Sequence, residues 1–333
     1  MTIKIGLIGG GSISETHARA AREIPGVEIT AVYGTNADKV ARLCQQYGGS
    51  PFPDLVAFLA HRPMDLVIIG SPSGLHAAQG IEAARRGLHI LTEKPIDIST
   101  ERTDALIEAA QKNGVKLGVI FQDRLKPDIR RLREKICAGK LGRITLIDAR
   151  VKWYRPPEYY GKSRWRGTFE FDGGGALMNQ GVHTVDLLLW LFGDAVNVQS
   201  RVQTALHAIE VEDTAVAILE FAGGALCTLE ATTAAYPGYP RRVEITGSEG
   251  TVILEDDRIV TSELRSSRDA IEQPDRPKDE GAASHVVNDI RGHQAVLEDF
   301  IHAIEHNGTP ACDGQEGRKS VALIEAIYRA ARK

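Results

Sequence analysis

The chain has 333 residues, of which 43% are hydrophobic and 25% are charged, with a formal net charge of −4. This length suggests two domains, and the composition excludes a chain that is disordered throughout. No apolar run approaches the roughly 18 residues of a membrane helix, and no basic block points to nucleic acid as a partner. The four cysteines are far apart and no signal peptide is evident. We therefore expect a cytoplasmic protein with free thiols and no metal site.

Short apolar runs alternate with helical patterns over residues 1–122. Strands are expected at 3–8, 27–33, 65–69, 89–91 and 116–121, and helices at 14–23, 37–47, 76–86 and 99–113. This alternation predicts β-α-β units, and hence an α/β first domain (1–122) with a doubly wound parallel sheet.

The pattern changes after residue 122. A helix at 128–138 precedes longer strands, expected at 144–153, 196–204, 214–221, 225–233, 241–246 and 251–255, and two final helices, at 289–305 and 316–332. Short turns such as Ala222-Gly223-Gly224 join consecutive strands, which predicts a large, mostly antiparallel sheet in an α+β second domain (123–333). We expect residues 262–285 to form a mobile surface loop, and the last helix could pack back on the first domain.

A glycine-rich turn, Gly9-Gly10-Gly11-Ser12-Ile13-Ser14, follows the first strand and opens the first helix. Glycines there let the backbone approach a pyrophosphate, whose charge the helix N-terminus favours. Ser14 occupies the position where a third glycine is usual. The prediction of nucleotide binding therefore rests mainly on the position of the motif between a strand and a helix. The first domain is therefore predicted to bind a dinucleotide through Gly9, Gly11, Ser12 and Ile13.

The end of the second strand bears on which dinucleotide binds. NAD-dependent enzymes usually place a carboxylate there to hold the ribose 2′-hydroxyl, and that charge repels a 2′-phosphate. In this chain the position is Gly34, followed by Thr35 and Asn36, with Lys39 one turn into the next helix. This pattern favours NADP(H). NAD(H) stays possible, because no arginine is present there and Asp38 could reach the ribose.

Three further motifs stand at defined places: Ser71-Pro72-Ser73-Gly74-Leu75-His76, Glu93-Lys94-Pro95 after the fourth strand, and Gly173-Gly174-Gly175-x3-Asn179-x3-His183-x2-Asp186. Together with the glycine turn, they make the chain similar to the Gfo/Idh/MocA oxidoreductases over essentially its whole length. The resemblance implies a Rossmann domain followed by an α/β domain with a large open sheet. It also implies a homodimer or homotetramer assembled through that sheet.

The resemblance implies roles for individual residues. Lys94 aligns with the catalytic lysine of the family, and His183 aligns with its catalytic histidine. Asn179 stands where an aspartate is common, and an amide cannot take a proton. His183 is therefore expected to be the general acid/base, since the unperturbed pKa of histidine lies near neutrality.

The cofactor pocket is expected to extend beyond the glycine turn. His76 matches a family position beside the nicotinamide, where it would shape the pocket rather than transfer protons. Glu93 is expected to position Lys94 rather than to react. The cofactor-binding candidates in these motifs are Ser71, Pro72, His76, Glu93 and Lys94. Three other histidines are expected at the surface: His61, His207 and His306.

Seven of the 19 aromatic residues fall between residues 153 and 171, on the segment that leads to the second glycine run. Aromatic faces stack on pyranose rings, and arginines can bind an acidic substituent through two hydrogen bonds. The segment resembles that of nucleotide-sugar uronate dehydrogenases within the family, while a core or subunit contact is the alternative for individual aromatics. The candidate substrate residues are Arg124, Tyr154, Arg155, Tyr160, Trp165, Arg166, Asn179 and His183.

The sequence therefore predicts an enzyme that transfers a hydride between a nicotinamide cofactor and a secondary hydroxyl or ketone of a carbohydrate. The carbohydrate would be a sugar, a sugar acid or a nucleotide sugar. Two alternatives stay open: glycosidic cleavage through transient oxidation by bound NAD, and a non-catalytic nucleotide-sensing regulator. Retention of Lys94 and His183 argues against the regulator, because a sensor needs neither.

Overall fold

The computed structural model describes residues 2–265, 267–268 and 289–332. The chain divides into two compact units, one made of residues 1–122 and 287–321 and the other of residues 123–286 and 322–333. Residues 289–321 thus group with the first unit, whereas the sequence places them in the second domain. The last helix, α10 (Gly314–Ala331), begins in the first unit and ends in the second.

The first unit is built on a six-stranded parallel sheet with the order β3-β2-β1-β4-β5-β6. Its strands are β1 (Ile3–Ile8), β2 (Val27–Tyr33), β3 (Ser50–Phe52), β4 (Leu66–Ile69), β5 (His89–Thr92) and β6 (Leu117–Val119). This confirms the predicted doubly wound sheet. The strand order reverses between β1 and β4, and sheets of this kind bind ligands at the carboxyl ends of the strands beside such a switch point.

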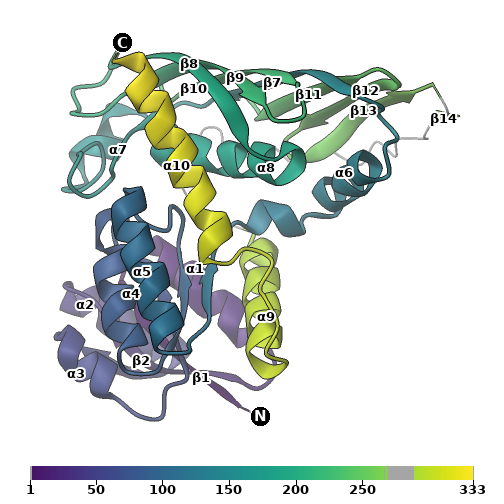
Figure 1. Ribbon diagram of the computed structural model, residues 1–333. Coiled ribbons are helices and arrows are strands. Elements are labelled where there is room, and N and C mark those ends of the chain that lie inside the picture. Colours follow the sequence, from purple (N-terminus) through teal and green to yellow (C-terminus); the bar gives the residue numbers. More distant parts are fainter. Residues whose placement is uncertain (1, 266, 269–288, 333) are drawn as a thin grey trace. The chain divides into compact units, whose positions relative to one another are not determined.

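Helices cover both faces of the parallel sheet (Figure 1). Right-handed crossovers place α1 and α2 on one face and α4 and α5 on the other, and α9 packs along α1. The helices are α1 (Ser12–Arg22), α2 (Ala37–Tyr47), α3 (Leu55–Ala60), α4 (His76–Ala84), α5 (Thr100–Lys112) and α9 (Arg291–Glu305). The sequence does not predict β3 and α3, because three and six residues are too few for a periodic pattern.

The second unit contains an eight-stranded sheet with the order β14-β13-β12-β11-β7-β10-β9-β8. Only the β7–β10 pair is parallel among its described pairs, which confirms a mostly antiparallel sheet. The strands are β7 (Ile144–Lys152), β8 (Ala195–Gln203), β9 (Thr214–Phe221), β10 (Leu226–Thr232), β11 (Arg242–Gly247), β12 (Gly250–Glu255), β13 (Arg258–Leu264) and β14 (Ser267–Arg268).

Part of the segment expected to be a mobile loop, 262–285, is strand instead. Residues 262–264 end β13, and residues 267–268 form β14. The strand continues because Ser262 and Leu264 are buried while Glu263 between them is exposed, which keeps the alternation of a half-buried strand. Residues 269–285 of the predicted loop lie outside the described residues.

The large sheet has one covered and one open face (Figure 1). Helices α6 (Pro127–Cys137) and α8 (Val182–Phe192) lie along the covered face, and the short helix α7 (Pro157–Gly161) follows β7. On the other face the side chains of Leu146, Val216, Ile218 and Leu226 are each about half exposed. Leu146 and Leu226 pair directly across β7 and β10, so the open face carries contiguous apolar surface.

A π-helical segment, η3 (Ala176–Gly181), leads into α8 and was not predicted from the sequence. The buried carboxylate of Glu212 caps its start by accepting the backbone N–H groups of Gly175 and Leu177, each at 2.9 Å. A Cβ on Gly175 would overlap the carbonyl oxygen of Glu212. Gly175 is therefore required for close packing within the second unit. The glycine run 173–175 thus does not by itself indicate a bound ligand.

Candidate functional site

The glycine turn lies between β1 and α1, beside the switch point of the parallel sheet. Gly9 has a φ of 124°, and a Cβ there would lie 2.7 Å from the carbonyl oxygen of Gly70. A Cβ on Gly11 would meet no heavy atom within 4 Å, so this glycine faces open space. No side chain caps α1, and the buried Oγ of Ser14 has no hydrogen-bond partner among the described residues. The uncapped backbone N–H groups at the start of α1, the open space at Gly11 and the Ser14 hydroxyl together fit a pyrophosphate group.

The end of β2 carries hydrogen-bond donors and a positive charge. A Cβ on Gly34 would lie 2.9 Å from a side chain of α2, so a larger residue at this position would require that side chain to shift. Asn36 caps α2 by accepting the N–H of Lys39 at 3.0 Å. Lys39 is exposed, and its Cβ lies 3.6 Å from the position of a Cβ built on Gly10. Thr35 at the same edge is also exposed.

A buried carboxylate, Glu93, immediately precedes Lys94 at the end of β5. Its Oε1 lies 2.9 Å from Nε2 of His17 and 3.8 Å from Nε2 of His293, and its Oε2 accepts the backbone N–H of Lys94 at 3.2 Å. Burial raises the pKa of Glu93, but the hydrogen bond to His17 and the nearby positive charges outweigh it and lower the pKa to about 2. Glu93 is therefore anionic and holds the backbone of Lys94, in keeping with a positioning role.

His76 ties together the loops that follow β4 and β5. Its Nδ1 lies 2.8 Å from the carbonyl oxygen of Pro95, and its Nε2 lies 2.9 Å from that of Ser71. The Ser71 hydroxyl donates to Gln79 at 2.6 Å, and Pro72 begins the short turn that leads into α4. Both ring nitrogens of His76 thus face backbone carbonyls of the first unit, which suits a residue that shapes a pocket.

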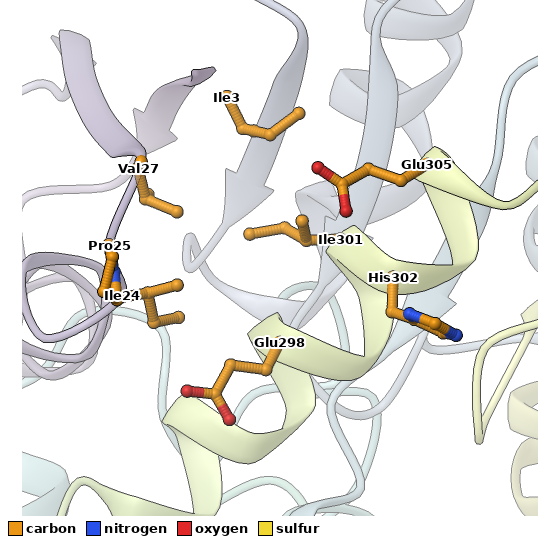
Figure 2. A pocket seen from close by; sticks show the side chains of 9 residues that line it. Ile3, Ile24, Pro25, Val27, Glu298, Ile301, His302 and Glu305 are labelled. Atoms are coloured by element: carbon orange, nitrogen blue, oxygen red, sulfur yellow. The ribbon is translucent and has the colours of Figure 1, made fainter. Parts of the chain in front are cut away.

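A cavity of about 230 Å³ lies elsewhere in the first unit, beside the start of β1, the turn before β2 and one side of α9 (Figure 2). Apolar side chains such as Ile3 and Ile301 form part of its wall, and Glu298, His302 and Glu305 of α9 line it as well. None of the predicted cofactor or substrate residues lines this cavity, so it is distinct from the candidate site.

In the second unit, His183 lies in the first turn of α8 beside a buried carboxylate. Its Nδ1 is 3.7 Å from Oδ2 of Asp123. Asp123 is paired with Arg241 and with Lys126, each at 2.8 Å. Burial raises the pKa of Asp123, but the positive charges of Arg241, Lys126 and His183 outweigh this effect and hold the pKa well below its usual range. A permanent negative charge therefore lies next to the predicted general acid/base.

Arg124, a predicted substrate residue, forms a buried bidentate ion pair. Its Nε and a terminal nitrogen donate to the two carboxylate oxygens of Asp186 at 2.9 and 2.6 Å. The two side chains are 2% and 1% exposed. This pair anchors α8 to the short turn η2 (Gln122–Leu125). A contact between Arg124 and a substrate stays a prediction.

Asn179, in η3, is oriented by a carboxylate that the sequence analysis did not single out. Its Nδ2 donates to Oδ1 of Asp172 at 2.7 Å, and Oδ2 of Asp172 accepts the N–H of Gly167 at 2.9 Å. An aspartate at position 179 would place two carboxylates against each other, so the amide matches its surroundings. The one signal for Asp172 in the sequence is its place directly before Gly173.

Stacked guanidinium and aromatic groups form much of the aromatic segment. The guanidinium of Arg166 lies 4.3 Å from the ring centroid of Tyr159 and 5.1 Å from that of Trp165. The guanidinium of Arg155 lies 5.5 Å from Tyr159 and 5.2 Å from Trp153. Contacts of this length are cation–π interactions. The predicted clustering of aromatics and arginines is thus present in space, while their binding of substrate stays a prediction.

Two tyrosines of the same segment have different surroundings. The Tyr160 hydroxyl lies 2.9 Å from the hydroxyl of Thr233, and burial raises its pKa to about 12. Tyr154 contacts Tyr236 edge to face, with ring centroids 5.2 Å apart. Tyr236 is 76% exposed and extends the aromatic surface to a residue far from the segment in sequence.

The expectation that His207 lies at the surface is wrong. Its Nδ1 lies 3.0 Å from Oδ2 of Asp213, and its Nε2 lies 2.8 Å from the carbonyl oxygen of Arg155. Asp213 also accepts backbone N–H groups of the loop around His207, so a local carboxylate holds the ring inside. Of the other two histidines expected at the surface, His306 is exposed and His61 is half-buried.

Two kinds of feature are absent from the described part of the chain. None of the described helices is both long and apolar enough to cross a membrane. Across the same residues, no three histidine, cysteine, aspartate or glutamate side chains are grouped so that they could hold a metal ion.

Comparison with known proteins identifies the family. Residues 3–121 match the oxidoreductase family with an NAD-binding Rossmann fold, and residues 129–253 match the GFO/IDH/MocA C-terminal domain. The chain belongs to the GFO/IDH/MocA family. This confirms the resemblance drawn from the sequence motifs, and it makes the protein an oxidoreductase of an NAD-binding family.

The similarity to known proteins extends over nearly the whole chain. The WlbA dehydrogenase of Bordetella pertussis, solved in complex with NADH and UDP-GlcNAcA, is 34% identical, with 100% of this chain and 96% of that one covered and a TM-score of 0.89. Inositol 2-dehydrogenase of Rhizobium meliloti is 27% identical, with 99% of this chain and 97% of the relative covered. Myo-inositol 2-dehydrogenase of Thermotoga maritima is 25% identical, with 96% and 94% covered.

The Glu93 cluster makes a prediction about stability. The carboxylate has a pKa lowered from 4.5 to about 2 in the folded chain, so its stabilising effect is complete above pH 4.5 and is lost as the pH falls toward 2. We expect Glu93→Gln to lower the free energy of unfolding near pH 7 by on the order of 3 kcal/mol. The difference from wild type should narrow below pH 4.5. Urea unfolding at a series of pH values measures both.

The matched control is Glu108→Gln, which makes the same change at an exposed position of α5. It should leave the free energy of unfolding nearly unchanged. Equal effects of the two substitutions would contradict the account of Glu93.

Proposed function

We propose that this protein is an NAD(P)-dependent dehydrogenase that oxidises a secondary hydroxyl of a nucleotide sugar or related sugar acid. The observation that carries the proposal is the likeness to WlbA, at 34% identity over the whole chain, together with the retention of Lys94 and His183. The solved WlbA dehydrogenase holds NADH and UDP-GlcNAcA. Its ligand carries the sugar and acidic groups that the aromatic and arginine side chains here would recognise.

Lys94 and His183 have complementary chemical roles in this proposal. The bound nicotinamide supplies the hydride acceptor. His183 takes the hydroxyl proton as general base, since an imidazole with a pKa near neutrality suits that step. The ammonium group of Lys94 stabilises negative charge as it develops on the substrate oxygen. Glu93 holds the backbone of Lys94, and Asn179 orients the substrate or His183.

The arginines of the aromatic segment favour an acidic substrate. Arg155 and Arg166 both stack on Tyr159, so their guanidinium planes are fixed before any ligand arrives. A fixed guanidinium group loses less conformational entropy on binding a carboxylate or phosphate than a mobile lysine does. Tyr154, Tyr160 and Trp165 complete the proposed carbohydrate surface, and Arg124 supports it through α8.

For the cofactor we propose a preference for NADP(H) over NAD(H). The support is the absence of a carboxylate at Gly34 and the presence of Lys39 beside the glycine turn. The NADH bound in the solved WlbA dehydrogenase favours NAD(H) instead. The residues proposed to hold the cofactor are Gly9, Gly11, Ser12, Ile13, Gly34, Thr35, Asn36, Lys39, Ser71, Pro72, His76, Glu93 and Lys94.

We further propose that the protein is a cytoplasmic homodimer or homotetramer assembled through the open face of the large sheet. The support is the apolar surface formed there by Leu146, Val216, Ile218 and Leu226, each about half exposed. Burying contiguous apolar side chains against a second copy gains about 25 cal/mol per Å² of surface.

Replacing Lys94 by alanine tests the catalytic assignment. We expect Lys94→Ala to lower turnover with UDP-GlcNAcA by several orders of magnitude, because the charge acts on the reacting oxygen. Nucleotide affinity should change far less, because the other residues proposed to hold the cofactor are unaltered. Steady-state rates and nucleotide binding by fluorescence titration separate the two effects. Lys112→Ala, an exposed lysine of α5, is the control and should keep full turnover.

The same assay separates the alternatives. Release of free sugar without net change in nicotinamide absorbance would indicate glycosidic cleavage. Nucleotide binding without turnover across uronates, nucleotide sugars and free aldoses would indicate a sensor. Wild-type turnover in Lys94→Ala would overturn the catalytic role of the lysine.

Replacing Lys39 by alanine tests the cofactor preference. Lys39→Ala should weaken NADPH binding about tenfold, which corresponds to 1.4 kcal/mol, and should leave NADH binding nearly unchanged. Fluorescence titration with each cofactor measures this without any substrate. Arg42→Ala, an exposed cation one turn further along α2, is the matched control. Tighter binding of NADH than NADPH by wild type would contradict the preference.

A charge placed on the open sheet face tests the assembly. Ile218→Lys should convert the oligomer to smaller species, because a lysine buried in the contact would lose its hydration. Sedimentation velocity measures the change in mass. Val56→Lys, at a 62% exposed position of α3, should not alter the assembly. A monomeric wild type would contradict the proposal.

A further inference from the structure

His183 needs more than a position to act as a base, since one ring nitrogen must be held protonated while the other accepts the proton. Asn179 cannot supply the negative charge that favours this state. The second unit offers another carboxylate, Asp123, which stands 60 residues earlier in the chain. Resting on the role proposed above for His183, we propose that Asp123 is the positioning carboxylate of His183, which selects its Nδ1–H form and stabilises its imidazolium.

The geometry defines which nitrogen is affected. Nδ1 is the ring atom that faces Oδ2 of Asp123, at 3.7 Å. This distance is longer than a hydrogen bond, so the coupling is electrostatic. The negative charge favours a proton on Nδ1, which leaves Nε2 as the basic nitrogen. When Nε2 accepts a proton, the same charge stabilises the resulting cation, as the carboxylate does in a Ser-His-Asp triad.

The carboxylate of Asp123 is held in place and held charged. Asp123 is 5% exposed and lies on η2, immediately before Arg124. Arg241 binds Oδ2 and Lys126 binds Oδ1, each at 2.8 Å. A carboxylate with two cationic partners stays ionised at any pH at which the enzyme would work.

The neighbouring charges compensate one another. Arg241 and Lys126 also pair with Asp257, so these two cations are matched by two carboxylates. Arg124 and Asp186, which follow Asp123 and His183 in their own elements, form a second neutral pair. Asp123 lies 3.7 Å from Nδ1, so its charge acts on the ring of His183 at short range, although Arg241 and Lys126 partly offset it.

The experiment measures the titration of His183 directly in the full-length chain. With ¹³C-labelled histidine, the NMR signal of His183 is assigned by its loss in His183→Gln. We expect Asp123→Asn to lower the pKa of His183 by about one unit, because an opposite charge at this distance raises a histidine pKa by such an amount. Lys126→Gln should raise the pKa of His183, because it removes a cation that partly neutralises Asp123.

The two variants are expected to shift the pKa of His183 in opposite directions. A purely structural role of Asp123 would not produce a defined shift of that pKa in either variant. Asp148→Asn removes a carboxylate of β7 that pairs with Arg150 and is 37% exposed, and it serves as the matched control with no expected shift. If Asp123→Asn does not fold, Lys126→Gln decides the question, since that lysine is itself 37% exposed. An unchanged His183 titration in the folded variant overturns the proposal.

The pH profile of kcat/KM links the coupling to the reaction. The acidic limb of this profile should follow the pKa measured by NMR. It should move to lower pH in Asp123→Asn and to higher pH in Lys126→Gln. Wild-type turnover in His183→Gln would contradict the proposed function, whereas the NMR shifts would still report on Asp123. Failure of the proposed function and failure of this inference are thus distinguishable.

Discussion

A carboxylate that is removed from water must be compensated by positive charge or by N–H donors, because its desolvation otherwise costs several kcal/mol. Both units of this protein place such groups beside the residues that matter most for the proposed reaction. Glu93 is compensated by two histidines and holds the backbone of Lys94. Asp123 is compensated by an arginine and a lysine beside His183. Loss of both partners would leave an uncompensated buried charge, so each cluster favours the arrangement in which its carboxylate meets them.

The sequence predicts the elements of both units well, for identifiable reasons. The strand β4 is a continuous apolar run, and such runs occur where a parallel sheet is covered on both faces. In the second unit, β9 alternates buried and exposed side chains, the pattern of a sheet with one open face. The Gly9 turn could be recognised because its backbone conformation excludes side chains. The prediction fails at β3 and α3, which are too short to show a period, and at β13, whose last residues were expected to lie in a mobile loop.

Within the candidate site, the sequence indicates residue types but not their partners. An arginine such as Arg124 has the same sequence pattern whether it faces a ligand or pairs with Asp186, and the structure shows the pair. His207 is held inside by Asp213, a contact that no periodicity reveals. Such pairings depend on how distant segments pack. They can be found only from the folded chain.

The π-helical turn before α8 limits how this protein can change in evolution. An α-helix advances about 100° per residue, and a π-helical turn accommodates an additional residue within a helix. Deleting one residue from Ala176–Gly181 would restore α-helical geometry and rotate Asn179 about the helix axis, while His183 kept its place on α8. The number of residues in this segment is therefore constrained as well as their identity, because an insertion or deletion would change the direction of Asn179 without altering any side chain.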